Sequence, residues 1–234
     1  MMQFSSDEGQ GSVVGVADVV LEVSGRRLLD GLSLAVMPRE SIAIMGPSGS
    51  GKTTLLNCIA GLIRPASGTV TVAGCDMNRG KQSRIAGQRL RNIGLVFQFG
   101  ELLPELTVIE NVVLPALFVG RSDAYAQATS WLEAVGMAEH ARQYPDSLSG
   151  GETQLVAIAR AMITEPAVVL ADEPTGALDE VNARLVTDLL LAACRLGGAA
   201  LLIATHDPAV ARSTDRTLRL RQGSLISEDI EELV

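Results

Sequence analysis

Aromatic residues are scarce in this chain. They make up 3% of its 234 residues, with one tryptophan, two tyrosines and four phenylalanines. The core must therefore depend on aliphatic side chains, since hydrophobic residues as a class still amount to 47%. Charged residues contribute 20%, and this balance excludes disordered, collagen-like and low-complexity proteins. The length suits one domain, or a domain that carries an inserted subdomain.

Cysteine is sparse, and long apolar runs are absent. The three cysteines, Cys58, Cys75 and Cys194, are far apart and form no CxxC pair. This spacing predicts neither a disulfide framework nor a zinc site, and it favours a reducing compartment. No apolar run approaches the roughly 18 residues that a membrane-spanning helix needs, and the first residues lack the pattern of a signal peptide. We expect a protein that does not cross a bilayer by itself and is not exported.

Positive charge is also in deficit. Nineteen lysines and arginines face 27 acidic residues, which gives a formal net charge of -8. A nucleic-acid surface needs clustered Lys and Arg, so this balance disfavours a nucleic-acid partner. We interpret the acidic excess as ordinary solubility.

Apolar runs and turn residues predict the organisation of the chain. Residues 1–12 are polar and glycine-rich and are predicted to form a flexible tail, and an acidic tail is predicted at 224–234. Between them we predict an α/β fold: a nucleotide-binding core with a strand-rich β subdomain at 13–98 and 165–223, and an inserted helical subdomain at 99–164. Strands are predicted at Val16–Val23, Leu28–Val36, Ser41–Met45, Thr69–Ala73, Val168–Ala171 and Ala199–Ala204.

A glycine-rich loop follows the predicted strand Ser41–Met45. Its sequence, GPSGSGKT, fits GxxxxGK[ST] and lies between a strand and a helix-compatible run. Glycines let backbone N–H groups wrap phosphates, and the helix N-terminus adds partial positive charge. Lys52 can reach the β- and γ-phosphates and the Thr53 hydroxyl can ligate Mg²⁺. The predicted nucleotide-binding residues are Gly46, Pro47, Ser48, Gly49, Ser50, Gly51, Lys52, Thr53 and Thr54.

Two acidic residues follow the predicted strand Val168–Ala171. Asp172 stands where open α/β sheets place ligands and can hold Mg²⁺. Glu173 can orient or deprotonate an attacking water. The same pair after a strand also occurs as a plain helix cap, and the glycine-rich loop favours the chemical interpretation.

A second anion-binding pattern opens a later helical run. Leu148–Glu152 reads LSGGE, and a serine and two glycines at a helix start suit an anion. One ATP in one chain would not need this second site. The simpler interpretation is a capping box formed by Ser149 and Glu152.

Taken together, these segments resemble the motifs of ABC-type ATPases, in the order of that family, from about Val16 to Gly223. The resemblance implies a P-loop NTPase core, with Gly46–Thr53 as Walker A and Val168–Glu173 as Walker B. It implies that Leu148–Glu152 is the signature motif, which caps the ATP held by a second copy of the domain. Further matches are Gln98 for the Q-loop, Ala177–Asp179 for the D-loop and His206 for the switch histidine.

The resemblance assigns roles to these residues. Catalytic residues would be Glu173, His206, Gln98 and Lys52, and Mg²⁺ ligands would be Thr53, Gln98 and Asp172. Ser149, Gly150, Gly151 and Asp179 would contribute to the nucleotide site of the second copy. Without the resemblance, Gln98 would be read as a surface glutamine and His206 as a structural histidine.

Two stretches indicate a branch of the family. Phe97–Val112 and Asp172–Asp179 resemble the lipoprotein-release, macrolide-export and cell-division group. This implies an ATP-binding subunit that forms a homodimer around ATP and Mg²⁺ and couples hydrolysis to export or mechanical work by an integral-membrane permease. The subunit would lie at the cytoplasmic face of the membrane. Alternatives are a soluble ABC ATPase in cofactor assembly or regulation, and an ABC machine on nucleic acid or the ribosome.

Two departures from the family pattern stand out. No Phe, Tyr or Trp lies between Phe4 and Phe97, so Val23 takes the place of the aromatic that stacks on adenine. Arg26 or Arg27 could stack a guanidinium there instead, and we predict weak discrimination between bases. After the signature, Thr153-Gln154-Leu155 replaces a QQR-like continuation, which removes a charge that could brace the helical subdomain.

Overall fold

Two β-sheets organise the chain, as seen in a computed structural model that describes residues 11–23 and 25–228. The first sheet is antiparallel, with four strands in the order β2-β1-β4-β5. Its strands are β1 (Val14–Val23), β2 (Arg26–Val36), β4 (Ser67–Val72) and β5 (Cys75–Asp76). The second has six strands in the order β10-β9-β3-β8-β7-β6. They are β3 (Ser41–Met45), β6 (Ile93–Val96), β7 (Val168–Asp172), β8 (Ala200–Thr205), β9 (Arg216–Arg221) and β10 (Ser224–Ser227).

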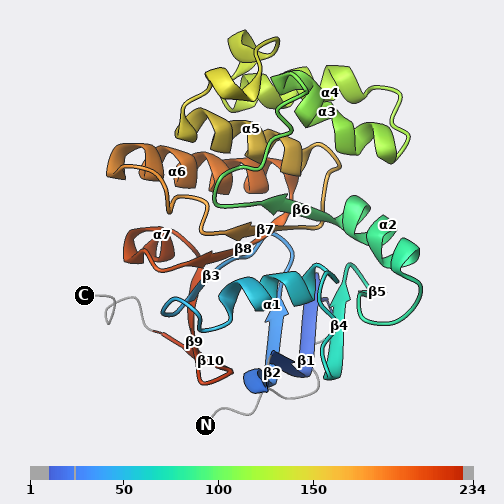
Figure 1. The fold of residues 1–234 in the computed structure, drawn as a ribbon, viewed down its shortest axis with the longest axis vertical. Helices are drawn as coiled ribbons and strands as arrows, with labels where there is room; N and C mark the ends of the chain where they lie inside the picture. Colours follow the sequence, from blue (N-terminus) through green and yellow to red (C-terminus); the bar gives the residue numbers. More distant parts are fainter. Residues whose placement is uncertain (1–10, 24, 229–234) are drawn as a thin grey trace.

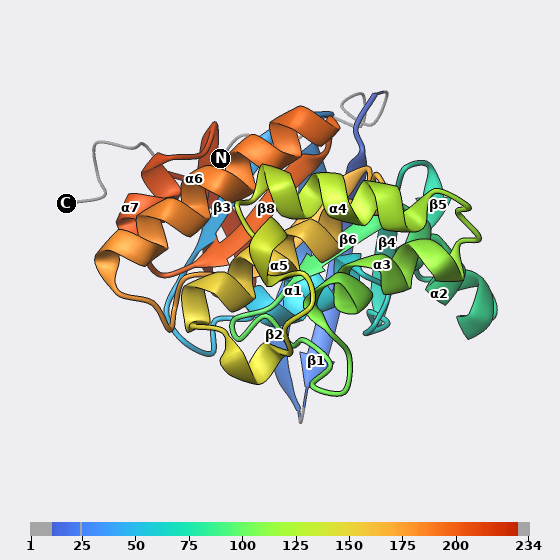
Figure 2. The same ribbon diagram turned by 90° about the horizontal axis from the view of Figure 1, so that it is seen from above.

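Helices cover both faces of the six-stranded sheet. They are α1 (Lys52–Ile59), α2 (Gln82–Asn92), α3 (Val108–Phe118), α4 (Ala124–Ala134), α5 (Gly150–Met162), α6 (Glu180–Gly197) and α7 (Pro208–Arg212), with 3₁₀ turns at Ala138–His140 and Pro145–Ser147. Figure 1 shows α1 between the two sheets and α5 and α6 on the opposite face, with α3 and α4 beyond them. Seen from above in Figure 2, α6 and α7 lie at one side of the molecule and α2 at the other.

Aliphatic packing fills both layers. Every residue of β3 and β8 is buried, because parallel strands covered on both faces are apolar along their length. One cluster of buried side chains joins α3, α4, α5 and α6 to the sheet, and a second joins α1 to both sheets. The α/β fold class predicted from the sequence is confirmed.

The far end of the chain differs from the prediction. An acidic tail was expected from residue 224, but Ser224–Ser227 forms β10, antiparallel to β9. The physical reason is a tight turn: Gln222 and Gly223 both have left-handed φ values, 50° and 81°, which suit a two-residue hairpin. The rest of this predicted tail, after Glu228, and residues 1–10 of the tail predicted at 1–12 lie outside the described residues.

The three thiols differ in their burial. Burial raises the pKa of Cys58 to about 11 and that of Cys194 to about 12, whereas Cys75 on β5 is partly exposed.

Among the described residues, no helix combines the length and the apolar character that crossing a membrane requires.

Helix α5 meets strand β6 through a very close backbone approach. Gly94 of β6 lies against α5, where an added Cβ would stand 2.5 Å from the carbonyl oxygen of Ala161. Only a residue without a side chain permits this spacing. The contact fixes how far α5 stands from the sheet edge.

We expect Gly94→Ala to destabilise the protein by about 1–3 kcal/mol, because the new methyl must push α5 away from β6. Urea unfolding followed by circular dichroism measures this change. The matched control is Gly87→Ala on α2, where an added Cβ has no atom within 4 Å. There alanine should stabilise the helix by about 0.5–1 kcal/mol. Equal effects of the two substitutions would contradict the close approach at Gly94.

Candidate active site

Loops from four strands meet at one edge of the six-stranded sheet. Strands β3, β8, β7 and β6 are parallel neighbours, so their carboxyl ends share that edge. A cavity of about 540 Å³ opens there. Gln98, Glu173 and His206 line it from the loops after β6, β7 and β8, and Leu28 lines it from β2. The other lining residues come from the loop after β3 and the start of α1: Ser48, Gly49, Ser50, Gly51, Lys52, Thr53 and Thr54.

The loop after β3 has the backbone form that wraps an anion. Gly46, Gly49 and Gly51 have φ values of 156°, 74° and 108°, which L-residues rarely adopt. A Cβ on Gly46 would stand 2.7 Å from Ser50 Oγ. Helix α1 begins directly after Gly51, so its free N–H groups face the cavity side. These features fit a bound phosphate chain.

Lys52 is held inside this loop. Its side chain is buried, with 7% of the residue exposed. Its Nζ donates to the carbonyl oxygen of Gly46 at 2.8 Å and lies 3.4 Å from Glu173 Oε1. The ammonium group is thus fixed between the loop and the acidic residue after β7.

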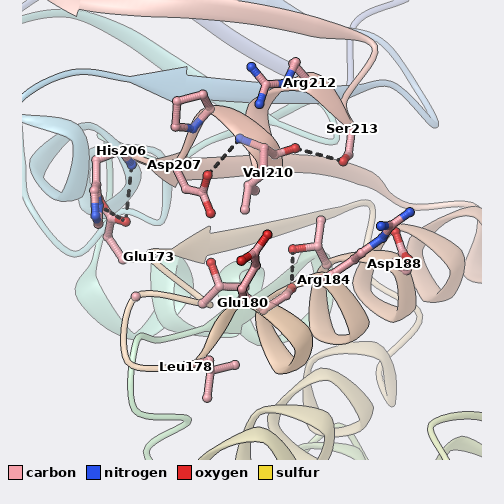
Figure 3. Close-up of a pocket in the computed structure, with 16 residues that line it drawn as sticks. Glu173, Leu178, Glu180, Arg184, Asp188, His206, Asp207, Val210, Arg212 and Ser213 are labelled. Carbon is pink, nitrogen blue, oxygen red and sulfur yellow. Dashed lines mark hydrogen bonds and ion pairs between the residues drawn. The ribbon is translucent and has the colours of Figure 1, made fainter. Parts of the chain in front are cut away.

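Glu173 has a strained backbone and two basic neighbours. Its φ of 46° is left-handed, a conformation that costs free energy in a non-glycine residue and is concentrated at functional sites. Its N–H donates to Ala204 O at 2.9 Å, which ties it to β8. His206 Nδ1 lies 2.8 Å from Glu173 Oε2, and Figure 3 shows these two side chains together at one end of a second cavity. That cavity, of about 610 Å³, lies between α6 and α7.

Asp172 offers an oxygen without a partner. Burial raises the pKa of its carboxyl group, against the opposing effect of a hydrogen bond from Thr53. Among the described residues, Asp172 Oδ1 is buried and has no hydrogen-bond partner. An orphaned carboxylate oxygen beside a hydroxyl is a donor set that suits a hard divalent cation. The residues present therefore fit Mg²⁺.

Gln98 reaches the same cavity from β6. Its side chain passes close to the loop after β7, since a Cβ on Gly176 would lie 3.1 Å from Gln98 Nε2. The sequence did not predict which side chains hold the loop after β6 in place. Gln154 and Arg160 of α5 donate to backbone carbonyls between Phe97 and Glu101. The helical spacing around them gave no signal that their side chains point at this loop.

The remaining predicted residues lie away from the cavity. Ser149 caps α5: its backbone N–H donates to Glu152 Oε2 at 2.7 Å, so the capping box considered from the sequence is present. Asp179 caps α6 by accepting from Asn182 N–H at 2.9 Å. A Cβ on Gly151 would lie 3.4 Å from Asn182, so the signature segment and the start of α6 are neighbours. The structure gathers these residues at a second place and does not bring them to Lys52.

The two arginines considered for base stacking have different surroundings. Arg27 is engaged with Glu22 at 3.2 Å and with Asp30 at 3.0 Å. Both arginines line a cavity of about 330 Å³ beside the glycine-rich loop, and Arg26 forms no ion pair among the described residues. Val23, which takes the aromatic position, is 45% exposed.

Comparison with known proteins gives consistent matches. The family model described as ABC transporter matches residues 29–176. The lipoprotein-releasing system ATP-binding protein LolD of Legionella pneumophila is 45% identical over 204 residues, covering 86% of this chain and 90% of that protein. LolD of Bacteroides fragilis is 42% identical over 202 residues, covering 86% and 94%.

Solved structures match over nearly the whole chain. The dimeric ATP-binding cassette MJ0796 bound to ADP and Pi has a TM-score of 0.83 and 34% identity, covering 93% of this chain and 98% of that one. CbiO1 of Clostridium perfringens, part of the transporter complex cbiONQ, has a TM-score of 0.83 and 25% identity, covering 92% and 87%. The fold, the motifs in order and these relatives agree, and the chain belongs to the ABC transporter family as an ATP-binding subunit.

Proposed function

We propose that this chain supplies energy to a transporter by binding and hydrolysing ATP at the cavity lined by Lys52 and Glu173. The observation that carries the proposal is the Glu173 carboxylate, held between Lys52 and His206 beside a phosphate-wrapping loop. A carboxylate in this place can accept the proton of an attacking water. Family membership agrees with this chemistry.

The other side chains have complementary roles in the proposal. Backbone N–H groups of Gly46–Thr53 and the Lys52 ammonium bind and orient the phosphates. Thr53, Asp172 and Gln98 would hold Mg²⁺, which supplies charge neutralisation on the phosphate oxygens when bound. His206 orients Glu173 through its imidazole, as the distance of 2.8 Å between Nδ1 and Oε2 supports.

A second copy would complete each site. Ser149, Gly150, Gly151 and Asp179 are absent from the lining of the phosphate cavity, although all four stand at helix starts. Ser149 and Asp179 are the N-caps of α5 and α6, and Gly150 and Gly151 are the first two residues of α5. A helix N-terminus favours an anion, and here the anion would be the ATP of the partner copy. The dimeric state of MJ0796 supports this arrangement.

The helical subdomain would contact a separate permease. Phe99 is 69% exposed and Phe118 is 71% exposed, although phenylalanine is among the residue types most often buried. A groove of about 420 Å³ runs between α2, β6, α3 and α5, with Leu90, Phe97 and Pro115 in its lining. An integral-membrane permease would place this chain at the cytoplasmic face of the membrane. The LolD relatives support a permease of the export type.

Glu173→Gln should lower kcat for ATP hydrolysis by about 10²-fold or more, because the amide cannot accept a proton. ATP affinity should be kept, and the dimer should accumulate with ATP. Phosphate release and size-exclusion chromatography measure the two effects. Glu180→Gln, at the start of α6, is the matched control and should keep the wild-type rate. Fast turnover of Glu173→Gln would refute the role of general base.

The chain should bind ATP and GTP with similar affinities, since no aromatic side chain stacks on the base. Fluorescence titration of both nucleotides measures this. Arg26→Ala should weaken both equally, while Arg27→Ala should change neither, because Arg27 is engaged with Glu22 and Asp30. A strong preference for ATP would contradict the expectation.

The tagged protein should copurify with an integral-membrane protein from gently solubilised membranes of its native host. Phe118→Asp should reduce this recovery, because a charge replaces an exposed apolar contact. Leu196→Asp, an equally exposed leucine at 74% on α6, should not. Recovery in the soluble fraction alone would overturn the proposal of a permease partner, while the proposal of ATP hydrolysis would stand.

A further inference from the structure

Gln154 presents an unusual buried amide. The residue lies in the first half of α5 and is 1% exposed. Its Nε2 donates to the carbonyl oxygens of Phe97 at 2.8 Å and of Gln98 at 2.5 Å. Its Oε1 is buried and has no hydrogen-bond partner among the described residues. An apolar side chain of this size would avoid that desolvation cost, so the two N–H donors are what the amide contributes.

Arg160 repeats the pattern farther along the same helix. Its Nη1 donates to Glu101 O and its Nη2 to Gly100 O, both at 2.6 Å. A planar guanidinium holds two acceptors in a fixed fork, whereas the donors of a lysine ammonium rotate freely. Gln154 and Arg160 together bind four carbonyls of the five-residue segment 97–101.

The segment also packs closely against α5. Gly100 has a left-handed φ of 69°, and an added Cβ would lie 2.7 Å from Thr153 Cγ2 and 3.1 Å from Thr153 O. The segment therefore has no room to shift toward α5. Gln98, the second residue of this segment, is held through its main chain while its side chain lines the phosphate cavity.

We propose that Gln154 and Arg160 are positioning residues that set where the Gln98 side chain stands in the phosphate cavity. They act through the carbonyls on either side of Gln98 and touch neither nucleotide nor metal themselves. Because α5 begins at the Ser149 cap, one helix holds Gln98 of its own site and presents the residues that would meet the ATP of the partner copy. This inference rests on the proposed ATPase function and on Gln98 acting in it.

A double-mutant cycle on the full-length protein tests the proposal. Gln154→Met keeps the size of the side chain and removes both donors. We expect it to lower kcat about tenfold, by misplacing Gln98, and to raise the Mg²⁺ concentration needed for half-maximal rate. ATP affinity measured without Mg²⁺ should stay unchanged. In a Gln98→Ala background the same substitution should have almost no further effect on kcat. The fold-changes that two substitutions cause multiply when the sites are independent, and they do not multiply when one site acts through the other.

Two further variants keep the test specific. Arg160→Lys, which preserves charge and loses the fork, should show an intermediate loss of kcat and the same dependence on Gln98. Gln127→Met removes glutamine hydrogen bonds to Arg121 and Asp123 elsewhere in the helical subdomain and should leave kcat unchanged.

The outcomes separate the two proposals. An equal loss of kcat from Gln154→Met with and without Gln98 would overturn the positioning role, and so would an unchanged Mg²⁺ requirement. A wild-type chain without ATPase activity would instead refute the proposed function. If Gln154→Met fails to fold, the same cycle with Arg160→Lys decides the question.

Discussion

Four chemical groups can meet over one cavity because four strands run parallel. The order β3-β8-β7-β6 brings the glycine-rich loop, His206, Glu173 and Gln98 to one edge of the sheet, although they span most of the chain. An antiparallel neighbour would have sent its following residue to the opposite edge. The buried aliphatic strands thus do more than fill a core, since their direction decides which residues can react together.

Residues that directly follow apolar strands were predictable, whereas the helix residues that hold the loop after β6 were not. Asp172, Glu173 and His206 each lie within two residues of a continuous apolar run, and Lys52 belongs to the glycine-rich motif that follows another such run. Helix α2 was missed because Ile85 is its one buried residue, so it carries almost no apolar period. Strand β9 was also missed, although its alternating arginines and leucines have the period of a half-buried strand.

The segment after the signature shows what pattern alone leaves open. The sequence suggested that a bracing charge is lost at Leu155, but the structure buries this residue, 8% exposed, in the apolar cluster that joins α3–α6 to the sheet. The bracing comes from its neighbour Gln154 and from Arg160, one turn and more farther along the helix. Apolar spacing identifies the buried face of a helix, whereas the direction of a buried polar side chain depends on a partner distant in sequence.

The unequal burial of the three thiols has a practical consequence for following this protein in solution. A thiol reacts as its thiolate, and the high pKa values of Cys58 and Cys194 make that form rare near neutral pH. Cys75 is partly exposed at the edge of the antiparallel sheet. A maleimide dye should therefore label one position of the unaltered sequence, and its fluorescence would report on the antiparallel sheet during the ATPase cycle.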